Sequence, residues 1–339
     1  MWRKIARVSA YMLAVALVVA YICYASNLAR KHRAQQRVEE IIISLPDSSE
    51  EHGFTSRERI LQDLEQNGLK VENVLVDSID AVAISKHIAK AGYVRDVNVY
   101  VTCAGKLYID VLQHKPVMRL LCGGLNTYVT AENHAFCAPD NTSCYTPVIT
   151  GCYTPLFSSD YEGTVGDHYD KLINQESDAM TELDNELSSL QKDKKVVVAK
   201  MAKVKGAEAD KYREKLASMT SLEKAFAERK QLLEERKKKL QKKSEDFAKL
   251  TNFVSEVGND TFWSAEIVQF VADTTYTGDI SLRLIPRSGN FVIEFGTLDD
   301  GSAKLAKLRK FYDKGLKHVG WDRYKTVDVK YDKQVICKE

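Results

Sequence analysis

The sequence has 339 residues, of which 44% are hydrophobic and 28% are charged, and it carries 49 Lys and Arg against 47 Asp and Glu. This apolar content is enough to build folded cores, which excludes a wholly disordered chain, and the length allows about two domains with additional segments. The net charge of +2 gives no reason to expect nucleic-acid binding, because that function usually requires a broadly basic domain.

The N-terminal segment is predicted to anchor the chain in a membrane. Residues 8–29 form an uninterrupted uncharged run, and a helix of this length crosses a hydrocarbon core of about 30 Å. Because it is the only such run, we expect a single-pass protein with a short tail at 1–7, a transmembrane helix at 8–29 and a linker at 30–37. Basic residues stand on both sides of the run, so the orientation rests on the large folded remainder, which is typical of an exported body. A cleaved signal peptide with a site near Ala25 is the alternative.

Residues 38–114 are predicted to form a small α+β module with the element order β-α-α-β-β. A β-rich run comes first, and two helices follow, the second of them capped by Asp77 or Ser78. Alternating apolar residues on both sides of the turn at Ala104 and Gly105 are typical of a β-hairpin. We expect the two helices to cover one face of the resulting sheet.

Two further segments, 115–169 and 251–339, are predicted to form one mostly antiparallel β-domain. Short strands and loops that contain Gly and Pro fill the first segment. Clear strand patterns return in the second, as in ISLRLIP at 280–286. One or two helices are expected to pack on this domain.

The residues between these segments, 170–250, are predicted to form a helical hairpin insert. Apolar residues recur there at heptad spacing, and Lys194 is the one interruption in the first arm. The register shifts at Gly206, the only glycine of the insert, which favours an antiparallel coiled-coil hairpin over an unbroken rod. In this hairpin Leu187 faces Phe226.

The charge of the two arms agrees with this alignment. Residues 170–186 contain six acidic residues and a single base, Lys171, and would lie along the strongly basic stretch 229–243. Opposite charges across a helix pair stabilise it. We therefore expect the basic run to find its partner inside the hairpin.

No motif for catalysis, cofactor binding or metal binding is present. The sequence lacks the H-E-x-x-H, G-x-S-x-G, P-loop and G-x-G-x-x-G patterns, and its seven His are scattered singly. No two Cys have the spacing of zinc ligands. We predict that the protein is not an enzyme, uses no cofactor and binds other proteins. Five of the seven Cys fall within 103–152, enough for one or two disulfides in an oxidising compartment.

Several short segments, in the right order, resemble the FtsQ/DivIB family of bacterial cell-division proteins, in its Bacteroidetes branch, with a POTRA domain behind the anchor. These segments are 98–100 (NVY), 105–111 (GKLYIDV), 113–119 (QHKPVMR), 127–129 (TYV), 136–139 (FCAP), 262–269 (FWSAEIVQ), 311–316 (FYDKGL), 320–324 (GWDRY) and 330–337 (KYDKQVIC). The resemblance covers 38–165 and 250–339. The insert at 170–250 departs from the family's usual length.

The resemblance implies a non-enzymatic, inner-membrane scaffold of the division machinery that links division proteins and septal peptidoglycan synthesis. Its N-terminus would be cytoplasmic and its body periplasmic, enriched at the division septum. The implied partners are FtsB and FtsL-type proteins, with FtsK and the septal peptidoglycan synthase, and no nucleic acid. The alternative is a periplasmic membrane-fusion-type adaptor of an export system, which requires two similar half-motifs around the hairpin that the sequence lacks. A cell-wall enzyme is a third hypothesis, disfavoured by the missing catalytic motifs.

The end of the chain is the candidate binding site. Residues 326–337 alternate apolar and polar side chains, and a terminal strand often lies at a sheet edge, where its backbone accepts a partner strand. With the resemblance, this predicts that FtsB adds a strand at this edge, next to side chains of the kind that dominate interfaces. The candidate partner-binding residues are Trp321, Tyr324, Val327, Val329, Tyr331, Gln334 and Val335. The alternative is a core strand, with Asp328, Lys330 and Lys333 as protective edge charges.

Overall fold

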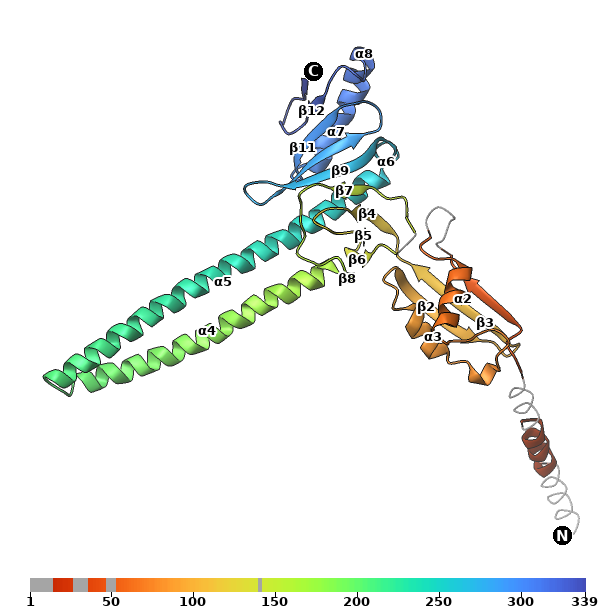
Figure 1. The fold of residues 1–339 in the computed structure, drawn as a ribbon, viewed down its shortest axis with the longest axis horizontal. Helices are drawn as coiled ribbons and strands as arrows, with labels where there is room; N and C mark the ends of the chain where they lie inside the picture. Colours follow the sequence, from red (N-terminus) through yellow and green to blue (C-terminus); the bar gives the residue numbers. More distant parts are fainter. Residues whose placement is uncertain (1–14, 27–35, 47–52, 140–141) are drawn as a thin grey trace, which may run out of the picture. The chain divides into compact units, whose positions relative to one another are not determined.

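The computed structural model describes residues 15–26, 36–46, 53–139 and 142–339 (Figure 1). The chain divides into two compact units. The first comprises Met1–His114 with Pro139–Tyr145, and the second comprises Lys115–Ala138 with Thr146–Glu339.

The predicted membrane segment is described only in part. Residues 15–26 are helical, and the side chains of Leu17 and Tyr21 are exposed. The rest of the predicted span, 8–14 and 27–29, lies outside the described residues, as does the tail at 1–7. Among the helices that are described, none combines the length and the apolar character needed to cross a bilayer.

The first unit contains a three-stranded sheet with two helices. Its elements are β1 (Glu40–Ser44), α2 (Arg57–Gln66), α3 (Ala81–Ile88), β2 (Val94–Val101) and β3 (Lys106–Gln113). The sheet order is β1-β3-β2, with β1 parallel and β2 antiparallel to β3. The predicted β-α-α-β-β order is therefore confirmed, and Leu64, Ile84, Leu107 and Ile109 form part of its core.

The second helix of this unit begins later than expected. A single 3₁₀ turn, Val76–Ser78, precedes α3, and the cap is Asp80, whose Oδ1 accepts a hydrogen bond from the backbone N–H of Ala83 at 2.9 Å. Asp, Asn and Ser all satisfy the unpaired N–H groups at a helix start. Asp77, Ser78 and Asp80 are thus equally suitable caps by residue type. Asp80 is the cap because the 3₁₀ turn contains Asp77 and Ser78.

The second unit is built on one ten-stranded sheet. Its strands are β4 (Pro116–Leu120), β5 (Thr127–Thr130), β6 (His134–Cys137), β7 (Val148–Thr150), β8 (Gly163–Thr164), β9 (Ile267–Thr274), β10 (Ile280–Pro286), β11 (Val292–Thr297), β12 (Thr326–Asp328) and β13 (Ile336–Lys338). Their order is β13-β12-β11-β10-β9-β7-β4-β5-β6-β8. Three neighbouring pairs, β4–β7, β7–β9 and β11–β12, run parallel and the others antiparallel. The pair β7–β9 joins the two segments that the insert separates in sequence.

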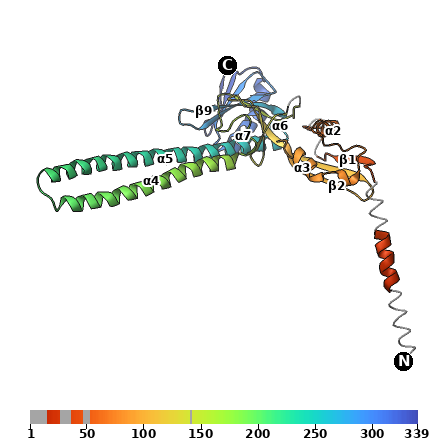
Figure 2. The same ribbon diagram turned by 60° about the horizontal axis from the view of Figure 1, so that its bottom comes forward.

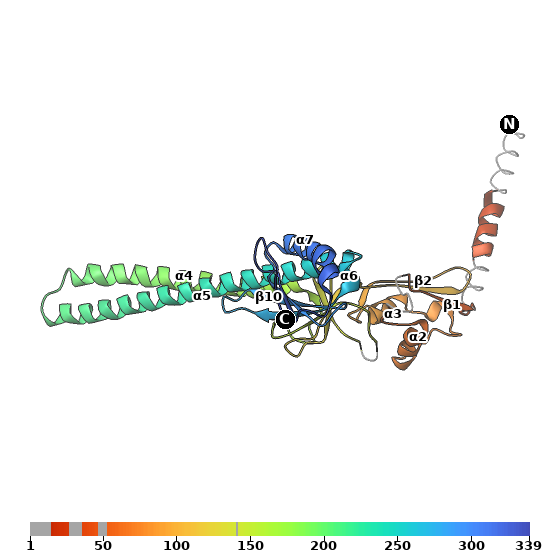
Figure 3. The ribbon, with the colours of Figure 1, turned by 90° about the horizontal axis from the view of Figure 1, so that it is seen from above.

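Two long helices connect β8 to the later strands. They are α4 (Val165–Met201) and α5 (Ala207–Asn259), and Figures 1, 2 and 3 show them running side by side. Gly206 precedes α5 with a φ of 75°, a conformation that glycine adopts without strain. The predicted antiparallel hairpin with its turn at this glycine is therefore present.

Both helices extend beyond the predicted insert and enter the core of the β-domain. Tyr169 near the start of α4 and Phe247, Leu250 and Val254 near the end of α5 are all at most 1% exposed. The ring of Phe247 makes an edge contact with Phe157 at 5.8 Å between centroids. The bases of the hairpin are thus structural parts of the β-domain.

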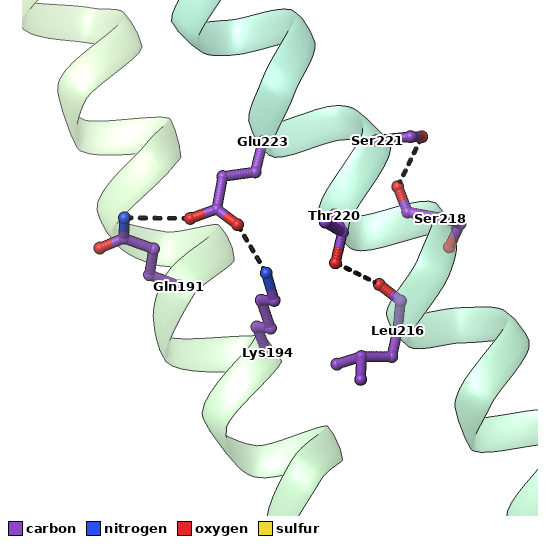
Figure 4. Close-up of polar contacts among 7 residues, drawn as sticks. All are labelled: Gln191, Lys194, Leu216, Ser218, Thr220, Ser221 and Glu223. Carbon is purple, nitrogen blue, oxygen red and sulfur yellow. Dashed lines mark hydrogen bonds and ion pairs between the residues drawn. The ribbon is translucent and has the colours of Figure 1, made fainter.

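The polar residues that interrupt the heptad pattern pair with each other (Figure 4). Lys194 Nζ lies 2.6 Å from Glu223 Oε2, and Gln191 donates to the other oxygen of Glu223 at 3.3 Å. Further down, Lys230 Nζ lies 2.6 Å from Asp184 Oδ1. The pair of Asp184 with Lys230 lies close to the predicted alignment, in which Leu187 faces Phe226.

The expectation that the basic run has its partner inside the hairpin is met only in part. Lys230 pairs with Asp184, but Lys242 pairs with Asp279 outside the hairpin at 2.5 Å. Within 165–259, all of which the structure describes, the exposed cations Arg236 and Lys243 make no ion pair. Their side chains are exposed.

Three cysteines of the 103–152 stretch, Cys122, Cys137 and Cys152, carry free thiols in this structure. Burial raises the pKa of the Cys122 thiol to about 11. Cys152 is exposed. These two thiols therefore differ strongly in their accessibility to reagents.

Candidate partner-binding edge of the β-domain

The last strand lies at one end of the ten-stranded sheet. β13 pairs antiparallel with β12, with Cys337 opposite Val327, and β12 pairs parallel with β11. Within the sheet that the described residues form, β13 and β8 are the two end strands. The strand expected at 326–337 is thus two short strands, and its first half lies inside the sheet rather than at the edge.

A turn between β12 and β13 splits the expected strand. Asp328 Oδ1 accepts a hydrogen bond from the backbone N–H of Lys330 at 2.9 Å, a local bond that favours chain reversal. Lys307, on helix α7 (Gly301–Phe311), donates from Nζ to the carbonyl of Val329 at 2.8 Å and also to that of Tyr331. This one ammonium group holds the turn against α7.

The backbone of β13 alternates between β12 and the open edge. The N–H of Lys325 donates to the carbonyl of Lys338 at 2.8 Å, whereas the N–H of Val329 donates to the carbonyl of Glu294 on β11 at 3.0 Å. Successive residues of a strand direct their backbone groups to opposite sides. The N–H and C=O of Cys337 therefore point away from β12, where a partner strand can pair with them.

Five of the seven predicted side chains pack into the β-domain. Val327 and Val329 are 0% exposed, so they hold β12 in the core and cannot contact a partner. Trp321, Tyr324 and Val335 are partly buried against the same core. Their side chains are therefore only partly available for contact with a partner.

Tyr331 and Gln334 are the predicted residues that remain exposed beside the edge. Tyr331 is 49% exposed, so about half of its side chain is available for contact. An ion pair that the sequence did not suggest joins Arg323 Nε, before β12, to Glu339 Oε1, after β13, at 2.9 Å. Sixteen residues separate the two partners, and only the β12–β13 turn brings them together.

A buried carboxylate supports the loop that leads into β12. Glu266, at the end of the short helix α6 (Trp263–Glu266), is 9% exposed, and its Oε1 accepts hydrogen bonds from Tyr312 Oη at 3.1 Å and from the N–H and hydroxyl of Ser288. Burial and the nearby negative charge of Glu266 raise the pKa of Tyr312, so its hydroxyl stays protonated. The Tyr312 ring packs edge-on against Trp321 at 5.4 Å.

Two family models match the chain. One, described as FtsQ/DivIB, C-terminal related, matches residues 199–338 and includes both strands of the candidate edge; the other, described as a POTRA-like domain, matches residues 36–112. Together the two matches support an FtsQ/DivIB-family protein with a POTRA domain. No curated protein is a match for it.

The FtsQ/DivIB match suggests a role in cell division. Members of the FtsQ/DivIB and POTRA families are non-catalytic division scaffolds, and the family implies a membrane-associated protein with other division proteins as partners. The fold is α+β and includes a POTRA-like domain. Neither match reaches 113–198, so α4 lies almost entirely outside the regions that the family explains.

Proposed function

We propose that this FtsQ/DivIB-family protein is a membrane-anchored, non-enzymatic scaffold that links division proteins and septal peptidoglycan synthesis through protein–protein contacts. The observation that carries the proposal is β13, an end strand whose Cys337 backbone groups face away from the sheet, within the region of the FtsQ/DivIB match. An unpaired strand edge accepts a strand of another protein through main-chain hydrogen bonds.

The partner proposed for this edge is FtsB. Backbone pairing with β13 supplies affinity, and Tyr331 with Gln334 offers side-chain contacts beside the strand. FtsL-type proteins, FtsK and the septal peptidoglycan synthase are proposed to contact other surfaces of the chain. The open strand edge supports this assignment, because an unpaired edge is a template for pairing with another chain. Tyr331 and Gln334 are exposed beside it.

A proline at Cys337 is expected to block this pairing without unfolding the domain. Proline lacks the N–H, and that of Cys337 points away from β12, so the bonds to β12 persist while a partner strand loses a donor. We expect Cys337→Pro to weaken FtsB capture by roughly tenfold or more, since an unsatisfied acceptor in the partner costs about 1–3 kcal/mol. The measurement is the affinity of the purified full chain for FtsB.

The matched control is Cys337→Ala, which changes the side chain but keeps the N–H and should bind FtsB like the wild type. Circular dichroism and the unfolding midpoint verify that both variants are folded. A folded Cys337→Pro protein with wild-type affinity for FtsB would show that β13 is not the docking strand.

We further propose that residues 8–29 span the inner membrane, with the N-terminus cytoplasmic and the body periplasmic at the septum. The uncharged run of the sequence and the membrane association of the family support this topology.

Thiol labelling tests the topology. In a chain whose only thiol is the exposed Cys152, a membrane-impermeant maleimide should react in cells with a permeabilised outer membrane and an intact inner membrane. A chain with only Cys122 should react about a hundredfold more slowly, because a pKa of about 11 leaves about a hundredth of the thiolate present at the usual pKa near 9. Protection of Cys152 until the inner membrane is lysed would place the body in the cytoplasm and exclude the proposed orientation.

A further inference from the structure

One flank of the helical hairpin carries exposed charges of opposite sign on its two helices. On α5, the cations Arg229, Arg236, Lys239 and Lys243 recur at spacings of three, four and seven residues and so lie on one face of the helix, which we call the basic stripe. All of them are exposed. None forms an ion pair within 165–259, a stretch described without a gap.

The corresponding flank of α4 is acidic. Asp178, Glu182 and Glu186 form what we call the acidic stripe, and they too are exposed and make no ion pair in this stretch. The polar pairs of Asp184 with Lys230 and of Gln191 with Glu223 occupy the other flank of the hairpin. Helical periodicity then places both stripes on the flank opposite to these pairs.

The same flank exposes aliphatic side chains. Leu222 is 45%, Leu232 is 49% and Val196 is 51% exposed. Leu222 and Leu232 fall within the helical face of the basic stripe, and Val196 continues the face of the acidic stripe. A helix face that combines aliphatic residues with unpaired charges of one sign is typical of a face that packs against another helix.

The register of the hairpin makes this flank complementary to itself. Asp184 lies opposite Lys230, so the basic stripe and the acidic stripe are at the same level along the hairpin. A two-fold axis parallel to the hairpin therefore stacks α4 of one copy on α5 of the other, with unlike charges together and Val196 near Leu222. A two-fold axis across the hairpin would stack α4 on α4, acid against acid.

We propose that this flank binds the same flank of a second copy of the chain, in a two-fold symmetric four-helix arrangement. Such an interface is isologous, because each copy contributes both stripes. The contact between the two copies ends before the tip of the hairpin. Near the tip, Lys200 on α4 of one copy would lie beside Lys215 on α5 of the other, and their like charges would repel. Because the charges are exposed, the association is weak to moderate and decreases with ionic strength.

Charge reversal tests this arrangement on the full chain in detergent, by sedimentation equilibrium. The α5 variant Arg229→Glu/Arg236→Glu and the α4 variant Glu182→Arg/Glu186→Arg should each weaken self-association by roughly tenfold or more. A mixture of the two variants should associate again as a heterodimer, because the acidic α5 of one then meets the basic α4 of the other. Two affinity tags allow this heterodimer to be recovered and counted.

The control is Lys224→Glu/Lys238→Glu, which makes the same charge change on the other flank of α5 and should leave the dimer intact. Circular dichroism checks that every variant keeps its helices. A monomeric wild type, variants that still dimerise, or a mixture that fails to associate would each overturn the proposal. Binding of the flank to a different protein, with a monomeric wild type, would likewise reject self-association.

Discussion

Replacement of 171–249 by a short linker is expected to destabilise the β-domain strongly. The deletion removes Phe247, which is 1% exposed and packs edge-on against Phe157. Loss of a buried Phe side chain costs about 3–5 kcal/mol, a large part of the 5–15 kcal/mol that typically stabilises a whole domain. The free energy of unfolding, measured by chemical denaturation with the fluorescence of the buried Trp263 as probe, should fall by at least this amount.

A shorter replacement, of 178–236, is the matched control. It removes most of the hairpin but retains both Tyr169 and Phe247, and the two helix ends that it joins lie side by side. This variant should keep the unfolding free energy of the β-domain close to that of the wild type. Equal stability of the two deletion variants would show that the bases of α4 and α5 do not belong to the core of the domain.

The second large effect is expected for Glu266→Ala. The change leaves the hydroxyl of Tyr312 and the polar groups of Ser288 without their buried acceptor. Unsatisfied buried polar groups cost about 1–3 kcal/mol each, so we expect a loss of roughly 2–4 kcal/mol in the free energy of unfolding. FtsB capture should weaken with it, because Tyr312 supports Trp321 and the loop into β12.

Two milder substitutions distinguish the effect of the lost hydrogen bonds on the free energy of unfolding from the effect of the lost side-chain volume. Glu266→Gln keeps an oxygen acceptor and should cost about 1 kcal/mol, and Tyr312→Phe removes one donor and should cost a similar amount. Chemical denaturation of the three variants under the same conditions provides the comparison. If Glu266→Ala is no less stable than Glu266→Gln, the carboxylate does not organise this part of the core.

The pattern along the sequence was sufficient where short-range physics decides the structure. Heptad spacing and the single Gly206 predicted the hairpin, because helix packing follows a period that can be read directly from the chain. The order of strands and helices at 38–114 was equally accessible, since alternation and capping residues act over a few positions. The family resemblance, carried by segments such as FWSAEIVQ at 262–269, agrees with the family match.

The candidate edge shows a feature that the pattern along the sequence could not predict. Alternation predicted a strand at 326–337, but a period of two does not tell whether a strand has one neighbour or two. Val327 and Val329 are buried because β11 lies beside β12, and the turn after them is held by Lys307, which comes from α7. The outward direction of the Cys337 backbone follows from that turn.

Only the tertiary structure could decide the long-range contacts. The pairing of β7 with β9 brings together residues more than one hundred positions apart, and the bond of Tyr312 to Glu266 spans 46 positions; neither leaves a local pattern. By itself the sequence determined the helical hairpin, the small α+β module and the family. The tertiary structure decided which hairpin residues serve the β-domain core, which charges stay unpaired and which strand forms the edge, because these depend on packing between segments that are distant along the chain.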